Sequence, residues 1–147
     1  GESTVLAIGG PWRIALRSPA AGLKVAGGAS LTDAALSGSG MELNGLHIRD
    51  PRTGSPARRK AAWAGAPFDS RTCSGRSAAA LSDALSTAFM LMSGRAVRAL
   101  CARWRGVSAV VEDGGRLVRS GRTAGVLLAL SQRSASNGSM ALTGGTA

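Results

Sequence analysis

Two oxygen-bearing side chains, Asp83 and Thr87, stand four residues apart in the segment SDALSTAFML. If this segment is helical, the spacing places both side chains on one face of the helix. A carboxylate and a hydroxyl are hard oxygen donors of the kind that Mg²⁺ and Ca²⁺ prefer, and a carbonyl, water and a phosphate would complete the coordination. A second interpretation is structural: Asp83 caps the helix or pairs with an arginine, and Thr87 bonds to its own helix. On the spacing alone, the structural interpretation is favoured.

The only histidine, His47, comes just before a polar corner, Asp50-Pro51-Arg52-Thr53-Gly54. Proline fixes φ and glycine accepts a positive φ, so the corner is expected to be rigid. A neutral imidazole that is held in one orientation can act as a general base near neutral pH. A single histidine near the end of a strand is more often a structural residue, and both roles stay open on the residues alone.

The pattern of apolar residues predicts the elements that position these groups. Residues 77–93 carry Ala, Leu, Phe and Met around most of the helical surface, which predicts a largely buried helix. Gly94 predicts a break, and residues 95–105 predict a second, amphipathic helix. The turn Gly9-Gly10-Pro11 predicts a hairpin between its flanking strands, and Gly114-Gly115 predicts another. The strands expected around these two turns are residues 3–8, 12–18, 107–113 and 116–120.

The remaining segments show turn signals and little regularity. Residues 19–33 are turn-rich, 34–45 form a loop or broken strand, 46–50 are short and β-like, and 55–76 are irregular and basic. We therefore expect an α+β fold in which β-hairpins pack against one buried and one amphipathic helix. Residues 1–130 form the expected domain, and residues 131–147 are rich in Ser, Gly, Thr and Ala, which predicts a disordered tail.

The composition fits one domain that carries a strong positive charge. The chain has 147 residues, 44% of them hydrophobic, and no apolar run approaches the ~20 residues of a membrane helix, so we expect a soluble protein. The net charge is +10, and Lys24 and Lys60 are the only lysines among 18 basic residues. Arginine suits phosphate or carboxylate partners, although a genome-wide preference for arginine explains the charge equally well. The cysteines, Cys73 and Cys101, lack the spacing of a zinc site, and a disulfide between them is not implied.

Four segments in the same order resemble the FAD:protein FMN transferases, the ApbE flavin-transferase family. HIRDPRTGSP resembles the family's His-x-x-Asp-Pro-x-Thr-Gly segment, and SDALSTAFML resembles its Asp-Ala-Leu-x-Thr helix. IGGPWRIALRSP is similar to the family's Gly-Gly turn and the strand after it, and AALSGSG is similar to its Ala-x-x-x-Ser-Gly segment. The hairpin predicted at 107–120 fits the end of the family more loosely.

The resemblance implies a Mg²⁺-dependent transfer of FMN from FAD to a threonine or serine hydroxyl of a target flavoprotein, with release of AMP. It implies that Asp83 and Thr87 are metal ligands. His47 would lie beside the diphosphate and take the proton of the incoming hydroxyl, and Ile48 would touch the flavin nucleotide. The segment RSGRTAG, residues 119–125, is loosely similar to the acceptor sequence of flavinylated targets, but Leu117 stands where those targets have an aspartate.

This chain also departs from the family pattern. The family is roughly twice as long, so we expect this chain to be its C-terminal part, with a missing N-terminal half or a partner chain supplying much of the FAD pocket. Residues 57–76 make a poor strand where the family has one, and Leu46 replaces an aromatic residue. The alternatives are a non-catalytic flavin-binding or structural relative and, third, a basic nucleic-acid-binding module, against which the scarcity of stacking aromatics argues. A periplasmic or membrane-anchored location is expected if the chain is like exported members, and a cytoplasmic one otherwise.

Overall fold

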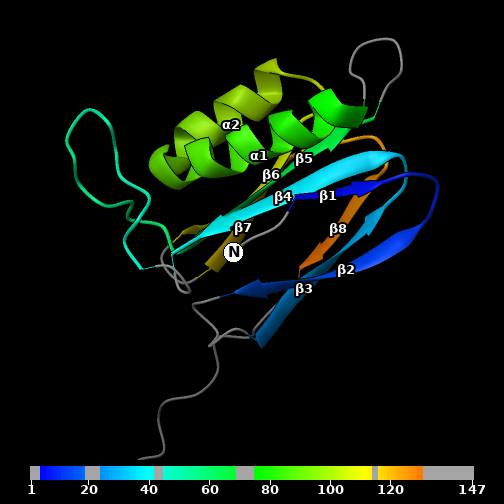
Figure 1. Ribbon diagram of the computed structural model, residues 1–147, viewed down its shortest axis with the longest axis horizontal. Helices are drawn as coiled ribbons and strands as arrows, with labels where there is room; N and C mark the ends of the chain where they lie inside the picture. Colours follow the sequence, from blue (N-terminus) through cyan, green and yellow to red (C-terminus); the bar gives the residue numbers. More distant parts are fainter. Residues whose placement is uncertain (1–3, 19–23, 42–44, 69–74, 114–115, 131–147) are drawn as a thin grey trace, which may run out of the picture.

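The chain folds into three layers, two helices above a five-stranded sheet and a three-stranded sheet below it (Figure 1). The computed structural model describes residues 4–18, 24–41, 45–68, 75–113 and 116–130. Its elements are β1 (Thr4–Ala7), β2 (Trp12–Ser18), β3 (Lys24–Leu31), β4 (Ala34–Gly40), β5 (Ala61–Pro67), α1 (Gly75–Leu91), α2 (Gly94–Arg103), β6 (Ser108–Asp113), β7 (Arg116–Gly121) and β8 (Val126–Leu130). The predicted α+β class is confirmed. Cys73, the turn at Gly114-Gly115 and the predicted tail at 131–147 lie outside the described residues.

Both sheets are antiparallel, and the larger sheet lies between two apolar layers. The strand orders are β1-β4-β5-β6-β7 and β2-β3-β8. Strand β5 alternates between the two layers: Ala62 and Ala64 belong to the cluster under the helices, whereas Trp63 belongs to the cluster between the sheets. This period of two follows from the pleat of a strand. No described helix is long and apolar enough to cross a membrane.

Helix α1 buries one face rather than most of its surface, which corrects the prediction. Its buried side chains recur at helical spacing and are Ala78, Ser82, Leu85, Ser86, Phe89 and Met90. Asp83 and Thr87 lie on the exposed side. Alanines on β5 and serines on β4 are small, so the helix can lie close to the sheet and bring its own polar groups within reach of β4. The face that carries Asp83 and Thr87 is therefore fixed by packing on the opposite face.

Helix α2 is amphipathic, as predicted, and starts after a well-formed cap. Ser93 Oγ accepts a hydrogen bond from Ala96 N at 3.2 Å, the arrangement of an N-cap serine. Val97 and Cys101 are four residues apart, and both are buried against the sheet. The helix begins at Gly94, so the break predicted there is the boundary between α1 and α2.

The expected hairpin between the first two strands is wrong. Strand β1 pairs with β4 in the larger sheet, whereas β2 pairs with β3 in the smaller one. Gly9 and Gly10 have φ of 66° and 142°, a backbone region that favours glycine, and here the turn carries the chain from one sheet to the other. The second expected hairpin is confirmed, since β6 and β7 pair from Ser108↔Gly121 to Asp113↔Arg116.

Three segments for which the sequence predicted no regular strand each contain a strand. Strands β3, β4 and β5 lie in the segments that we interpreted as turn-rich, broken or irregular. They are built largely from Ala, Gly and Ser, which have low β propensity, and pairing on both sides outweighs that preference. Strand β8 also follows the last predicted strand and completes the smaller sheet beside β3.

The three passages between the sheets meet at one corner of the molecule. Gly9 N donates to Asp33 Oδ1 at 2.8 Å, which ties the β1–β2 turn to the β3–β4 turn. Thr32 N donates to Gly125 O at 2.8 Å, which ties the β3–β4 turn to the β7–β8 connection. This crossing corner, formed by residues 9–10, 32–33 and 125, holds the two sheets together at one end.

Candidate functional site

The carboxylate of Asp83 reaches from α1 to the first two strands of the larger sheet. Its Oδ1 accepts one hydrogen bond from Thr4 Oγ1 at 3.2 Å and another from Ser37 Oγ at 3.1 Å. Thr4 and Ser37 are paired residues of β1 and β4, and their hydroxyl oxygens lie 3.0 Å apart. Within the described residues, no arginine forms an ion pair with Asp83. Two hydroxyls from the sheet thus orient this carboxylate.

Thr87 lies one turn further along α1 and makes its hydrogen bond to the same strand. Its Oγ1 is 3.1 Å from Ser39 Oγ, and Ser39 follows Ser37 by two residues, so both serines point to the helix side of β4. No bond from Thr87 Oγ1 to its own helix occurs in the described structure. Asp83 and Thr87 therefore lie together on one exposed strip beside the edge strand β1.

This pair is a small donor set for a divalent cation. The described residues contain no group of three or more His, Cys, Asp or Glu side chains that could enclose a metal ion. A magnesium ion in a phosphate-binding site commonly takes one or two carboxylates and completes its octahedron with phosphate oxygens and water. One carboxylate and one hydroxyl at i and i+4 would suit a cation of that kind, shared with a phosphate group.

His47 lies in the loop between β4 and β5 and is exposed. Its Nδ1 is 3.1 Å from Gly45 O. A carbonyl oxygen only accepts, so Nδ1 carries the proton in this bond, and in the neutral ring Nε2 keeps its lone pair. No hydrogen bond in the described part of the chain joins His47 to Asp83 or Thr87.

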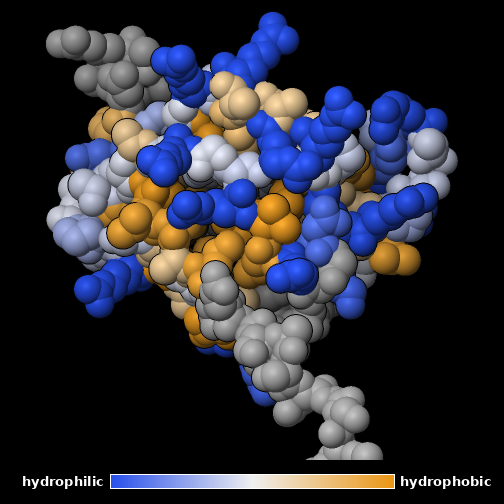
Figure 2. Space-filling model, turned by 180° about the vertical axis from the view of Figure 1, so that it is seen from behind, coloured by the Kyte–Doolittle hydropathy of each residue, from blue (hydrophilic) through white to orange (hydrophobic). Residues whose placement is uncertain are grey.

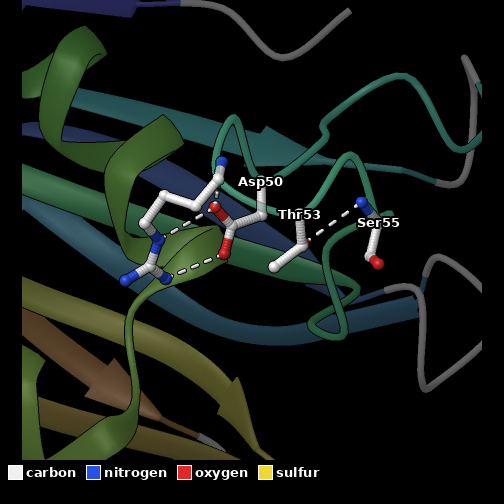
Figure 3. Close-up of polar contacts among 4 residues, drawn as sticks. Asp50, Thr53 and Ser55 are labelled. Carbon is white, nitrogen blue, oxygen red and sulfur yellow. Dashed lines mark hydrogen bonds and ion pairs between the residues drawn. The ribbon is translucent and has the colours of Figure 1, made fainter.

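The corner after His47 is fixed by hydrogen bonds centred on Asp50 (Figure 3). The backbone oxygen of Asp50 accepts from Thr53 N at 3.2 Å and from Gly54 N at 2.7 Å. The carboxylate of Asp50 accepts from Arg52 N at 2.9 Å and from the Arg52 guanidinium at 2.8 Å, and these bonds lower the pKa of Asp50 from 3.8 to about 2. Together with the Ser55 N bond to Thr53 Oγ1, these contacts give the corner the rigidity that its sequence predicts.

Ile48 connects this loop to the core. It is 8% exposed and packs in the cluster beneath the helices, and Ala57 N donates to its carbonyl at 2.8 Å. The side chain therefore holds the loop on the body of the protein. Its contact with a flavin nucleotide stays a prediction.

A hollow of about 1090 Å³ lies between this loop, the end of α1 and the end of β6. Arg59 lines it, yet its guanidinium is buried and donates to Met92 O and Glu112 O, both at 3.2 Å. These bonds tie the α1–α2 junction to the sheet. Asp83, Thr87 and His47 do not line the hollow, so it is separate from the oxygen pair.

The positive charge is dispersed over the surface. On the face shown in Figure 2, hydrophilic side chains alternate with apolar ones instead of forming one block. The exposed arginines lie on α2, on strands of both sheets and in loops: Arg13, Arg17, Arg49, Arg52, Arg58, Arg95, Arg98, Arg103, Arg105, Arg116, Arg119 and Arg122. This distribution differs from the continuous basic groove of a protein that follows a nucleic-acid backbone.

The segment that is loosely similar to a flavinylation acceptor buries both of its hydroxyl-bearing residues. Ser120 and Thr123 are 8% and 6% exposed. Thr123 Oγ1 is 3.1 Å from Gly65 O and 2.8 Å from Ser108 Oγ, so its hydroxyl is engaged inside the protein. The fold thus removes both hydroxyls from the surface where an acceptor would have to be.

The sequence interpretation assigned no role to the hydroxyls that support Asp83 and Thr87. Ser37 and Ser39 stand at i and i+2 in a segment that was expected to be irregular, so their shared face was not visible. The i and i+4 spacing of Ser82 and Ser86 marks one face of the helix, but nothing in the sequence shows that this face meets β4.

Comparison with known families gives a match to the model of the ApbE family over residues 1–111. The matched range runs from β1 through both helices into β6, and it contains His47, Ile48, Asp83 and Thr87. No curated protein matches the chain.

Proposed function

This chain belongs to the ApbE family, and from that premise we propose that it takes part in the transfer of FMN from FAD to a threonine or serine hydroxyl of a target flavoprotein. In this reaction the hydroxyl oxygen bonds to the FMN phosphorus, the bond from that phosphorus to the bridging oxygen breaks, and AMP leaves with that oxygen. Membership supports a flavin-transferase type of function in general. The observation that carries the finer proposal is the oriented pair of Asp83 and Thr87 on α1.

In this proposal, Asp83 and Thr87 hold Mg²⁺ together with the diphosphate of FAD. The ion would neutralise charge on the diphosphate and on the departing AMP. The carboxylate is suited to the task because two hydroxyls hold one of its oxygens, Oδ1, in place. No described side chain bonds Oδ2, so this second oxygen can face a cation.

His47 is the proposed general base. Its Nδ1 donates to Gly45 O, so Nε2 is the atom that accepts the proton of the attacking hydroxyl. The corner at Asp50 and the buried side chain of Ile48 would keep the loop in place. Since no described contact joins His47 to the oxygen pair, the proposal requires the diphosphate to bridge them.

Isothermal titration of FAD into the chain, with Mg²⁺ or with EDTA, tests the oxygen pair. We expect Mg²⁺-dependent binding that is lost in Asp83→Asn and in Thr87→Val, and kept in Thr87→Ser, which retains the hydroxyl. Asp113→Asn is the matched control, because it removes an exposed carboxylate elsewhere on the surface. Equal binding by the wild type and Asp83→Asn would refute the proposed metal site.

Release of AMP separates catalysis from binding. With FAD, Mg²⁺ and an acceptor flavoprotein, the proposal expects AMP from the wild type and little from His47→Ala, while FAD binding by this variant persists. Mg²⁺-dependent binding without AMP release, with or without a partner chain, would instead indicate the non-catalytic flavin-binding relative.

A further inference from the structure

A series of hydroxyl groups connects Thr87 to the backbone of Asp83. Thr87 Oγ1 lies 3.1 Å from Ser39 Oγ, and Ser39 Oγ lies 2.8 Å from Ser86 Oγ. Ser86 Oγ is in turn 2.9 Å from the backbone oxygen of Asp83. Ser39 and Ser86 are buried, with 9% and 0% exposure, so their hydroxyls must find partners within the protein.

The backbone oxygen at the end of this series sets the direction of every bond in it. A carbonyl oxygen only accepts, so Ser86 donates to Asp83 O. Each hydroxyl has one proton, and therefore Ser39 donates to Ser86 and Thr87 donates to Ser39. The 3.4 Å contact from Ser86 Oγ to Ser37 Oγ is longer and does not compete well. Thr87 thus directs its proton into the protein and keeps its lone pairs available on its other side.

The carboxylate of Asp83 is oriented from the same strands. Thr4 and Ser37 both donate to its Oδ1, because an ionised carboxylate only accepts. The two hydroxyl oxygens also lie 3.0 Å apart, so each hydroxyl has the other as an alternative partner, and the charge of the carboxylate favours donation to Oδ1. Both members of the oxygen pair are therefore supported by hydroxyls whose protons point in defined directions.

We propose that Ser39, Ser86, Ser37 and Thr4 are positioning residues that present the oxygens of Thr87 and Asp83 to a divalent cation. This inference rests on the proposed function and names residues that would not touch the cation or FAD. Hydroxyls in such a supporting layer set the orientation and basicity of the ligands, and their removal commonly weakens metal affinity by about 10- to 100-fold. A purely structural role would make the same serines matter for stability alone.

The test is the Mg²⁺ dependence of FAD binding, measured by titration calorimetry on the full 147-residue chain. We expect Ser39→Ala to raise the half-saturating Mg²⁺ concentration by about tenfold, with FAD affinity restored at saturating Mg²⁺. Ser82→Ala is the control, because Ser82 is also a buried serine beneath the helix but bonds to Ala79 O, outside the series. Thr4→Val should raise the half-saturating concentration, and Thr4→Ser should restore it.

The outcomes separate this inference from the proposed function. If Ser39→Ala responds to Mg²⁺ as Ser82→Ala does, while Asp83→Asn loses the response, the positioning role is refuted and the metal site stands. If Asp83→Asn keeps the wild-type Mg²⁺ response, or the wild type shows none, both the site and the positioning role are refuted. A loss of FAD affinity at every Mg²⁺ concentration in Ser39→Ala would show a structural role and would also overturn the inference.

Discussion

Replacing Arg59 by methionine tests whether a buried guanidinium holds the α1–α2 junction on the sheet. Methionine keeps much of the apolar stem and removes the donors to Met92 O and Glu112 O. Hydrogen bonds to a charged group contribute about 1.5–3 kcal/mol each, so losing two of them destabilises the protein. Methionine also removes the cost of burying a charge, which offsets part of this loss. We therefore expect the free energy of unfolding to fall by about 3 kcal/mol.

The ion pair of Arg59 should contribute little to this loss. Its Nη1 lies 3.7 Å from Asp113 Oδ2, and the Asp113 side chain is 57% exposed, so solvent screens the pair and its contribution is below about 1 kcal/mol. Asp113→Asn should therefore leave the stability nearly unchanged. The loss in Arg59→Met should also persist at high salt concentration.

Urea unfolding followed by circular dichroism measures the effect. With a slope of about 1–3 kcal/mol per M, the midpoint of Arg59→Met should fall by about 1–3 M. Arg58→Met is the control, because Arg58 is the exposed neighbour of Arg59. The free energy of unfolding of this variant should stay within about 0.5 kcal/mol of the wild-type value. Equal midpoints for the two variants would refute the reasoning, and a full loss in Asp113→Asn would assign the effect to the ion pair.

Three further predictions concern the corner at residues 50–54, the core residue Phe89 and the buried Cys101 thiol. Asp50 contributes stability that is complete above about pH 4 and is lost as the pH falls through its pKa of about 2; in Arg52→Ala an NMR titration should show that pKa rising toward 3.8, and an unchanged pKa would contradict the role of Arg52. Phe89→Ala should lower the free energy of unfolding by about 3–5 kcal/mol in thermal or urea unfolding, because the ring is fully buried between α1 and the sheet, and a loss below about 1 kcal/mol would contradict that packing. Burial raises the pKa of the Cys101 thiol, so Cys101 should react with a thiol reagent only at the rate of unfolding, and fast labelling of the native protein in a Cys73→Ser background would oppose this.

The sequence predicts the helices well because their signal is local. Apolar residues at helical spacing, with no proline between them, place α1 within about two residues of its observed ends. The same pattern could not show which side of the helix is buried, because alanine occurs on both sides and packs equally well in either place. The burial of Ser82 and Ser86 depends on small partners in β4 and β5, which come from distant parts of the chain.

The strands were harder to predict because long-range pairing determines them. Gly27 illustrates the difficulty: glycine is a poor strand former, yet a Cβ there would lie 2.7 Å from Ala129 O on β8. For the site, the spacing of Asp83 and Thr87 indicated an oxygen pair. Their support by Thr4, Ser37 and Ser39 required the β1–β4 pairing and the position of α1 above it.

Because the chain crosses between the sheets at this crossing corner, strands that pair in the smaller sheet are far apart in the sequence, and this affects folding during synthesis. Strands β2 and β3 are synthesised long before β8, so their sheet stays incomplete until residues 126–130 have been added. During that interval Leu16 and Leu31 lack Leu128, their partner in the layer between the sheets. Contacts between such distant residues slow folding, and an unpaired strand edge invites association with other chains. Gly27 and Gly28 lie in the middle of this open edge, and glycine is a poor strand former, so we expect the edge of β3 to pair only weakly with other chains until β8 is in place.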